Sequence, residues 1–223
     1  MHLAIIMDGN RRWGEKKGLP VFEGHRHGAE KIKEVTRWCI KRRIEILTLF
    51  AFSTENWKRA EKEVGFFMDL AEKFIIENIK ELHKEGVRVR FYGERKGIPK
   101  ALLGEMGMTE ALTVGNNRIV MNILFNYGGR AEIVEAVKKI VAQGFAVSQI
   151  DETKIAEYLY TAGLPDPNLI IRTSGERRLS NFLTWQSVYS ELYFTERYWP
   201  DFSEKDLDGA LAEYARRQRR FGR

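Results

Sequence analysis

Four short apolar runs, each ending abruptly at polar or charged residues, constrain the fold of this chain more than any other feature. They are residues 3–7, 46–52, 119–125 and 169–171, and segments with helical spacing separate them. Apolar runs of this length, without polar alternation, are typical of strands buried on both faces of a parallel sheet. Strands that alternate with helices, with no internal repeat, predict an α/β fold around a mainly parallel sheet.

Residues 87–92 and 192–194 predict two further strands, which gives a six-stranded sheet flanked by helices. The helices are expected at residues 23–43, 60–84, 98–113, 131–141, 153–160 and 204–220. No Pro/Gly/Ser-rich linker divides the chain, so residues 1–223 are expected to form a single domain. The segment 60–84 is apolar over a broad arc. Ordinary core packing accounts for this pattern, and so does the wall of a cavity that holds a lipid.

The composition limits the function classes. The formal net charge is +6 at pH 7, which favours an anionic partner: nucleic acid, phosphorylated metabolites or a membrane surface. No apolar run approaches the roughly 18 to 20 residues of a membrane span, and residues 3–7 are too short for a signal peptide. Cys39 is the single cysteine, so no internal disulfide can form, and a reducing cytoplasm is the expected location.

The turn after the first apolar run, Asp8-Gly9-Asn10-Arg11-Arg12, combines an acid with groups that bind anions. Gly9 lets the backbone approach a ligand closely, and Asn10 can cap the helix that follows. A carboxylate beside two guanidinium groups suggests that a Mg²⁺ ion and a phosphate ester lie between them. Taken alone, the turn has a simpler explanation, in which Asp8 caps the helix and the arginines are solvated.

The other apolar runs end at similar turns, and open α/β sheets bind their ligands at the carboxyl ends of the strands. We therefore expect one site built from all four turns. Its members would be Asp8, Asn10, Arg11, Arg12, Ser53, Glu55, Asn56, Asn126, Arg172, Arg178 and Ser180. Two arginine clusters suggest two phosphorylated groups. The chain has no G-x-x-x-x-G-K-[ST] motif and no G-x-G-x-x-G motif after a strand, which excludes these nucleotide-binding loops.

Six segments carry a resemblance to a known family. They are Met7–Trp13, Phe52–Trp57, Asn126–Arg130, Arg172–Glu176, Arg178–Phe182 and Trp185-Gln186. In order and spacing they resemble the cis-prenyltransferases, transferases of isoprenoid biosynthesis that add isopentenyl diphosphate, with cis geometry, to an allylic diphosphate. The resemblance implies a fold with a hydrophobic tunnel and a Mg²⁺-dependent synthase that starts from farnesyl or another allylic diphosphate. The implied product is a long-chain polyprenyl diphosphate such as undecaprenyl diphosphate, a lipid-carrier precursor for cell-wall or glycan synthesis.

The resemblance also implies roles for individual residues. Asp8 would organise Mg²⁺ and drive departure of the allylic diphosphate, with Asn56 as a second catalytic residue, and Glu191 resembles the family's other acidic metal-site residue. The allylic diphosphate would be bound by Gly9, Asn10, Arg11, Arg12, Trp13, His25, Ser53, Glu55, Trp57 and Arg59. Isopentenyl diphosphate would be bound by Arg172, Arg178, Ser180, Arg220 and Gly222.

The resemblance leaves alternatives open. The ending Arg220-Phe221-Gly222 resembles a tail that reaches a partner's site, which implies a homodimer. Leu124 and Phe125 are bulky and would shorten the tunnel, whereas the small Ala51 leaves its mouth open, so a short- or medium-chain synthase is an alternative. A non-catalytic partner subunit would usually lack the acid at Asp8. A nucleic-acid binder would carry a recognised binding module, which this chain lacks. An apolar product implies peripheral contact with a membrane.

Overall fold

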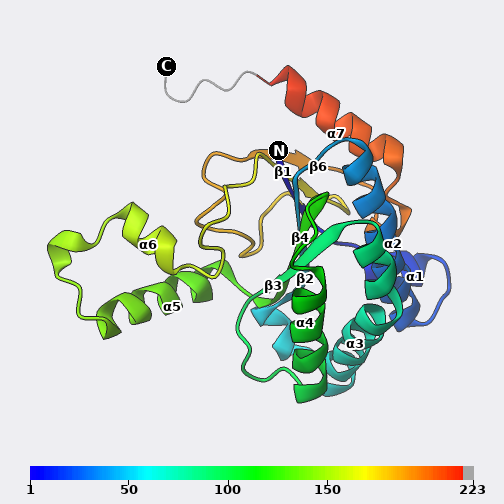
Figure 1. The fold of residues 1–223 in the computed structure, drawn as a ribbon. Coiled ribbons are helices and arrows are strands. Elements are labelled where there is room, and N and C mark those ends of the chain that lie inside the picture. The colour runs from blue at the N-terminus through cyan, green and yellow to red at the C-terminus, as the bar shows by residue number, and fades with distance from the viewer. Residues whose placement is uncertain (218–223) are drawn as a thin grey trace.

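All six strands of the sheet run parallel, in the order β3-β4-β2-β1-β5-β6 (Figure 1). The computed structural model describes residues 1–217. The strands are β1 (His2–Ile6), β2 (Ile46–Ser53), β3 (Val87–Tyr92), β4 (Ile119–Tyr127), β5 (Leu169–Arg172) and β6 (Glu191–Phe194). The expected six-stranded parallel sheet is confirmed.

The expected helices are also present, with small shifts at their ends. They are α1 (Asn10–Lys16), α2 (Val21–Lys41), α3 (Glu61–Lys84), α4 (Lys100–Thr113), α5 (Gly129–Ala142), α6 (Glu152–Tyr158) and α7 (Glu204–Arg216), with 3-10 turns η1 (Thr54–Lys58), η2 (Val147–Gln149) and η3 (Trp199–Asp201). The helix expected at 204–220 is seen as far as Arg216, and residues 218–220 lie outside the described part of the chain.

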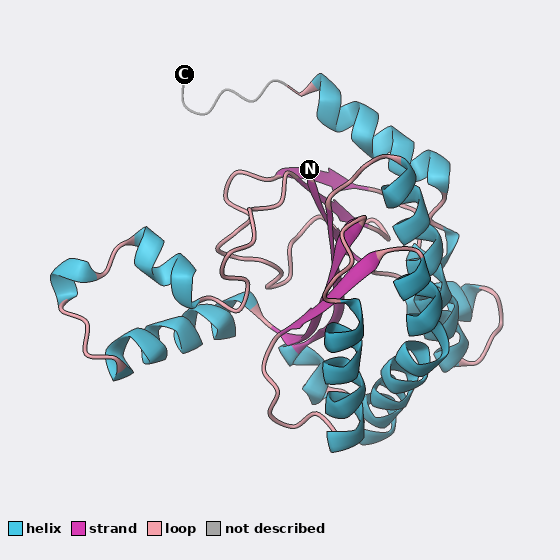
Figure 2. Ribbon diagram, in the orientation of Figure 1, coloured by secondary structure: helices cyan, strands magenta, loops and turns pink. Residues whose placement is uncertain are grey.

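The two faces of the sheet are covered differently (Figure 2). On one face, α2, α3, α4 and α7 pack on strand residues such as Leu3 and Ile5 to form the main core. On the other face, the alternate strand residues Ala4 and Ile6 pack against the loop that carries Phe182. The expectation of a sheet flanked by helices therefore holds for one face, whereas loop segments cover much of the other.

The outer edge of β3 is protected by α4 and the turn after it. The backbone N–H groups of Val89 and Phe91 donate to Thr113 Oγ1 (3.0 Å) and Glu110 Oε1 (2.8 Å). Asn116 Nδ2 donates to the Val87 carbonyl oxygen at 2.7 Å. These side chains take the place of a further strand, so the edge cannot pair with another chain.

The topology switches direction at β1, and this switch positions the site. β1 lies between β2 and β5, and Ile6 is in register with both Phe50 and Arg172. The segments that follow β1 and β5 therefore leave the sheet side by side, at the kind of crevice where open α/β sheets bind ligands. Helices α5 and α6 form an arm that projects from the carboxyl end of β4 (Figure 1).

Candidate active site at the carboxyl edge of the sheet

The turn after β1 requires glycine at position 9. Gly9 has a φ of 97°, and a Cβ there would lie 2.6 Å from the Tyr198 ring and 2.7 Å from Ser174 Cβ. The Gly9 N–H donates to Asp8 Oδ1 at 2.7 Å, and the Asp8 N–H donates to Thr173 Oγ1 at 2.9 Å. The backbone and its neighbours thus fix the direction of the Asp8 carboxylate.

Asp8 is held as an anion by two arginines. Arg172 Nη2 lies 2.8 Å from Asp8 Oδ2, and Arg12 Nη2 lies 3.5 Å from Asp8 Oδ1. Burial alone would raise the pKa of Asp8, but the hydrogen bond and charge of Arg172, the Gly9 N–H and the charge of Arg12 outweigh it. The pKa of Asp8 therefore lies below its ordinary value, and the carboxylate is ionised at neutral pH.

Arg172 connects the two arginine clusters, Arg11 with Arg12 and Arg172 with Arg178, which are far apart in the sequence. Its side chain is buried, and Nη1 donates to the Arg178 carbonyl oxygen and to Ser180 Oγ at 2.7 Å. On the other side, Arg12 contacts Ser174 Oγ at 2.5 Å and Glu176 at 3.4 Å, and Glu176 also pairs with Arg178. The result is one polar network in which three guanidinium groups pair with two carboxylates. We call it the polar network; its members are Asp8, Arg12, Arg172, Ser174, Glu176, Arg178 and Ser180.

Asn10 does not cap α1, contrary to expectation. Gly9 occupies the cap position without a side-chain bond, and Asn10 is the first helical residue, with Nδ2 donating to the Met7 carbonyl oxygen at 3.1 Å. Asn10 packs against the α2 backbone, since a Cβ on Gly24 would lie 1.9 Å from its carbonyl oxygen and one on Gly28 2.2 Å from its Oδ1. Packing against α2, and not a cap, fixes its amide.

His25 is a neutral side chain and adds no positive charge. The helix begins at Val21, two residues before the expected start at residue 23, so His25 lies in its second turn. Burial and the charge of Arg59 lower its pKa to about 4, with Arg11 contributing in the same direction against Glu63. At neutral pH the ring can offer one donor and one acceptor to a ligand.

Three buried polar atoms at this edge have no hydrogen-bond partner among the described residues. They are Asn10 Oδ1, His25 Nε2 and Arg172 Nε. Buried polar atoms in native structures are nearly always paired, so a group of exceptions in one place indicates where a ligand binds.

The turn after β2 is shaped by its own side chains. Asn56 Oδ1 accepts a hydrogen bond from the Ser53 N–H at 2.9 Å, which fixes the first turn of η1. Glu55 Oε1 accepts from Asn181 Nδ2 at 2.7 Å, which brings η1 beside the segment that follows β5. Trp57 donates through its indole N–H to Asn126 Oδ1 at 2.7 Å. The structure thus gathers Ser53, Glu55 and Asn56 at the same edge as the polar network.

Three of the expected allylic-site residues are engaged elsewhere. Trp13 is 7% exposed and donates to Asp201 Oδ1 at 2.7 Å, so its indole packs in the core. Arg11 is exposed and pairs with Glu15 at 2.9 Å. Arg59 pairs with Glu63 at 2.5 Å, and its guanidinium lies 5.4 Å from the Phe67 ring centre.

Glu191 is not beside Asp8, so the expected two-carboxylate metal site does not form within one chain. Glu191 begins β6 in register with Leu169 and Leu3, five residues before Asp8, which is roughly 16 Å along the strand direction. Its carboxylate pairs with Arg217 at 2.8 Å. The two other expected residues, Arg220 and Gly222, lie outside the described residues.

Asp8 is the donor at this edge that could hold a magnesium ion together with phosphate oxygens. No group of three or more His, Cys, Asp or Glu side chains within residues 1–217 could hold a metal. Asp8 is ionised and its side chain is 29% exposed. Magnesium is commonly bound by one or two carboxylates together with substrate phosphates, and Asp8 suits that arrangement.

An apolar cavity of about 130 Å³ begins beside this edge and extends between α2, α3, α4 and the sheet. Asn10, His25 and Ala51 line it close to the polar network. Deeper lining residues include Phe67, Leu70, Phe74, Ile79, Val89, Met106, Met121 and Phe125. The broad apolar arc of α3 is therefore a cavity wall. Of the two bulky residues singled out in the sequence, Phe125 lines the cavity, whereas Leu124 belongs to the core on the other face.

Sequence reasoning missed two members of the site. Thr173 holds the Asp8 backbone in both directions, since its hydroxyl also donates to the Asp8 carbonyl oxygen at 2.7 Å, and Ser174 accepts from Arg12. Ser174 has a positive φ of 75°. The signal that could have identified them is the polar run that directly follows β5.

Known proteins resemble this chain over its full length. The prenyltransferase family model, described as "Putative undecaprenyl diphosphate synthase", matches residues 6–222. An isoprenyl transferase of Thermotoga maritima is 49% identical, covering 99% of this chain and 96% of that protein. A Legionella pneumophila ditrans,polycis-undecaprenyl-diphosphate synthase, described as (2E,6E)-farnesyl-diphosphate specific, is 44% identical, covering 99% and 94%.

Two solved structures share the fold. Lavandulyl diphosphate synthase from Lavandula x intermedia, in complex with dimethylallyl diphosphate, is 37% identical with a TM-score of 0.96, covering 100% of this chain and 98% of that one. A probable undecaprenyl diphosphate synthase from Campylobacter jejuni is 30% identical with a TM-score of 0.83 and the same coverage. With the site geometry, these matches establish that the chain belongs to the prenyltransferase family of undecaprenyl diphosphate synthases.

Proposed function

We propose that this chain is a cis-prenyltransferase that condenses isopentenyl diphosphate units onto an allylic diphosphate, with farnesyl diphosphate as the primer. One observation carries the proposal: a network of arginines and an ionised aspartate lies at the mouth of an apolar cavity. A molecule with a diphosphate head and a hydrocarbon tail matches both parts. The farnesyl-specific synthase of Legionella pneumophila supports the choice of primer.

The allylic diphosphate would lie beside Asp8 and Arg12, with its chain in the cavity. Arg12 is 43% exposed and can turn from Ser174 towards phosphate oxygens, and Asn10 and His25 offer polar atoms without partners. A Mg²⁺ ion bound at Asp8 would neutralise charge on the leaving diphosphate, which is the requirement for breaking the allylic carbon–oxygen bond. Asp8 would hold the ion in place, and the buried Arg172 holds Asp8.

The isopentenyl diphosphate would lie on Arg178, Ser180 and Arg172. Arg178 is 61% exposed, so its guanidinium, which pairs with Glu176 here, is accessible to phosphate oxygens and could bind them in a bidentate manner. Because Arg172 touches both Asp8 and Ser180, the two diphosphates would bind next to each other. Such proximity would hold the isopentenyl double bond close to the allylic carbon that it attacks.

A long-chain product, such as undecaprenyl diphosphate, is our first choice because two relatives with 44% identity are named as synthases of it. The short-chain alternative has support of its own. Phe125 narrows the cavity, and the lavender enzyme with a TM-score of 0.96 is named for lavandulyl diphosphate. The intact Asp8 network argues against a non-catalytic partner subunit.

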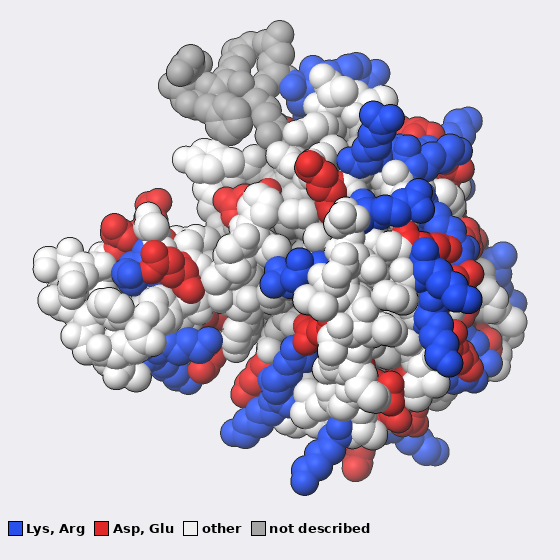
Figure 3. All heavy atoms as spheres, in the orientation of Figure 1, with Lys and Arg blue, Asp and Glu red and all other residues white. Residues whose placement is uncertain are grey.

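A homodimer is part of the proposal, and the arm formed by α5 and α6 is the surface that favours it. Val134, Val137 and Val141 lie on one face of α5 and are 51%, 44% and 68% exposed, and Val147 on η2 is 87% exposed. The outer part of the arm is mostly uncharged in the view of Figure 3. A second copy would cover this apolar face.

The dimer has a direct test. Val141→Asp should shift the protein towards monomer in analytical ultracentrifugation, because a buried charge opposes association. Val114→Asp is a matched control, since Val114 is 60% exposed but lies at the end of α4, away from the arm. A wild-type protein that sediments as a monomer would contradict the dimer.

We also propose that the enzyme works in the cytoplasm and contacts the membrane peripherally when its apolar product leaves. Within the described part of the chain, no helix has the length and apolar character to cross a membrane. The positive net charge suits an anionic substrate or lipid surface, and no nucleic-acid partner is proposed.

The function is tested by incubating the protein with farnesyl diphosphate, isopentenyl diphosphate and Mg²⁺ and analysing the products by mass spectrometry. A ladder that ends near one polyprenyl length is the expected result. A product that contains only one or two added isopentenyl units would favour the short-chain synthase. No product with any allylic primer would contradict the proposal and favour the partner subunit.

A further inference from the structure

Asn126 ends β4 in a conformation that few residues adopt. Its φ is 52°, in the left-handed region, and the residue is 3% exposed. Asparagine tolerates this region better than most residues, but glycine tolerates it best. Glycine would therefore suit the backbone conformation at position 126 as well or better. The hydrogen bonds of the amide must explain why asparagine is present.

The side chain of Asn126 joins two separate loops. Its Oδ1 accepts from the Trp57 indole N–H at 2.7 Å, and its Nδ2 donates to the carbonyl oxygens of Glu94 (2.8 Å) and Lys96 (3.1 Å). Its backbone carbonyl oxygen accepts from the Glu94 N–H at 3.1 Å. One buried amide thus uses both of its N–H groups and its oxygen to fasten η1 to the loop between β3 and α4.

The two fastened segments reach the wall of the apolar cavity through a stack of aromatic rings. The Trp57 ring packs edge-on against Phe52 at 5.4 Å, and Phe52 contacts the rings of Phe67 (5.8 Å) and Phe125 (5.3 Å), which both line the cavity. Trp57 itself is 37% exposed. The indole is therefore the outer member of an aromatic stack that leads from solvent to the cavity wall.

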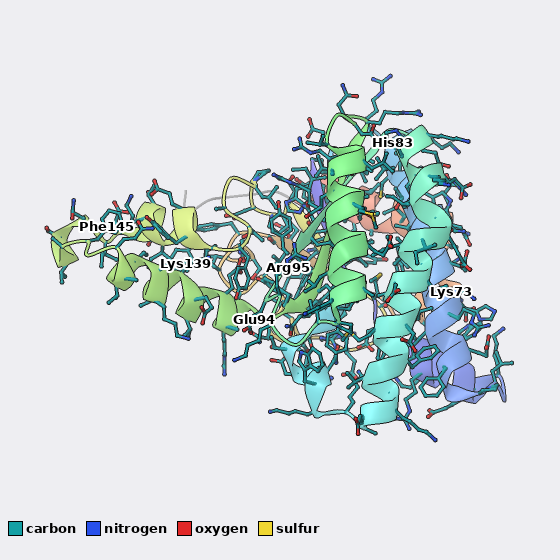
Figure 4. All side chains as sticks on the ribbon, turned by 60° about the horizontal axis from the view of Figure 1, so that its bottom comes forward. Lys73, His83, Glu94, Arg95, Lys139 and Phe145 are labelled. Carbon is teal, nitrogen blue, oxygen red and sulfur yellow. The ribbon has the colours of Figure 1, made fainter. Side chains whose placement is uncertain are left out.

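The loop of residues 93–97 closes tightly on this stack. A Cβ on Gly93 would lie 2.0 Å from the Phe125 carbonyl oxygen, and a Cβ on Gly97 would lie 3.4 Å from the Trp57 ring. Figure 4 shows Glu94 and Arg95 on this loop, between the arm and α4. The loop has few other ties to η1, so the Asn126 amide is the principal polar connection between them in the described structure.

We propose that Asn126 is a positioning residue for the allylic substrate. By fixing the Trp57 ring and the loop of residues 93–97 as one unit, it holds the aromatic stack against the wall of the cavity that would take the hydrocarbon chain of an allylic diphosphate. The polar network, which binds the diphosphates, does not contact it. This inference rests on the proposed function, and it concerns affinity for the chain rather than the bond-breaking step.

Two variants separate the parts of this unit. Asn126→Gly keeps the left-handed backbone and removes the amide, whereas Trp57→Phe keeps an aromatic ring and removes the indole N–H together with part of the ring surface. Each should weaken binding of farnesyl thiodiphosphate, an unreactive analogue, by about fivefold to tenfold, the effect of one or two net hydrogen bonds. The double variant should bind little more weakly than Asn126→Gly alone, because both changes break the same connection.

Asn116→Ala is the matched control. Asn116 Nδ2 also donates to two carbonyl oxygens, those of Val87 (2.7 Å) and His83 (3.3 Å), but it lies at the other end of α4. This variant should lower the melting temperature as Asn126→Gly does and leave analogue binding within twofold of the wild type. Isopentenyl diphosphate binding should stay unchanged in all of the variants.

Acrylamide quenching of Trp57 fluorescence, taken as the difference between proteins with and without Trp57, gives a second measure. Loss of the Asn126 amide should increase the quenching. Unchanged analogue binding in Asn126→Gly, or additive effects in the double variant, would overturn the inference. Since binding needs no turnover, a wild-type protein that binds the analogue but forms no product would contradict the proposed function and leave this test valid.

Discussion

The polar network and the apolar cavity meet at the carboxyl edge of the sheet, and they are built in opposite ways. In the network, charged side chains from the turn after β1, from α1, from the end of β5 and from the segment after β5 hold one another through ion pairs and hydrogen bonds. In the cavity, α2, α3 and α4 leave the sheet incompletely covered, and apolar side chains surround the space. The first region suits a diphosphate, and the second suits a chain without polar groups.

This difference predicts which region of the enzyme controls turnover and diphosphate binding, and which controls product length. Changes in the network should alter turnover and the binding of either diphosphate, with the product length unchanged. Changes in the cavity should alter product length, with smaller effects on the chemistry. The four predictions below test that division, from the largest expected effect to the smallest.

Asp8→Ala should lower kcat by about 10³-fold, because it removes the carboxylate that we propose holds a Mg²⁺ ion beside the leaving group. The change should leave the fold intact, which circular dichroism would check. Asp8→Asn is the control for shape, since it can still accept from Arg172 but carries no charge. If Asp8→Asn retained wild-type turnover, the charge would not be needed and the magnesium assignment would be wrong.

Arg178→Ala should raise the KM for isopentenyl diphosphate by about 10- to 100-fold, the cost of losing charged hydrogen bonds, and should change that for farnesyl diphosphate little. Steady-state kinetics with each substrate varied in turn gives both constants. Arg178→Lys keeps the charge but not the planar fork, so it should recover part of the loss. Equal increases for both substrates would mean that the two diphosphate sites are misassigned.

Phe125→Leu should lengthen the product by one or more isoprene units, because Phe125 lines the cavity and a smaller side chain enlarges it. Its stability cost should be about 1–2 kcal/mol. Leu124→Val is the control: Leu124 is the adjacent core residue on the other face, so its loss of a methylene should lower stability and leave the product distribution unchanged. Mass spectrometry of the products distinguishes the two.

His25 lies where the two regions meet, and it should make stability fall in mild acid. Its pKa is about 4 in the folded chain and 6.5 in a free histidine, so between these values the unfolded state binds a proton that the folded state does not. Stability is therefore full above pH 6.5 and decreases as pH falls towards 4, by up to about 1 kcal/mol per pH unit.

Urea denaturation between pH 7 and 4.5 measures how the free energy of unfolding changes with pH. His25→Gln should show a shallower decline than the wild type. His2, whose pKa is also lowered to about 4 by burial, remains in both proteins and cancels in the comparison. An identical slope in the two proteins would mean that His25 carries a proton in the folded state.

Much of the fold could be predicted because its signals are local. Strand β3 has the bounds expected from its sequence, and the apolar runs gave the other strands, since hydrophobic spacing reflects the geometry of each segment. The placement of Asp8 at a strand end was predictable for the same reason. The helix cap at Asn10 could not be predicted in this way. Its side chain donates to the Met7 carbonyl oxygen and packs on α2, and it does not cap α1.

The sequence by itself determined that the chain has an α/β sheet, that polar turns meet at its carboxyl edge and that the motifs are those of a prenyltransferase. Only the tertiary structure decided which side chains pair. Asp8 and Arg172 are 164 residues apart, and strand order brings them together. Strand register places Glu191 at the opposite edge. Such contacts depend on how distant segments pack, and no local pattern records that packing.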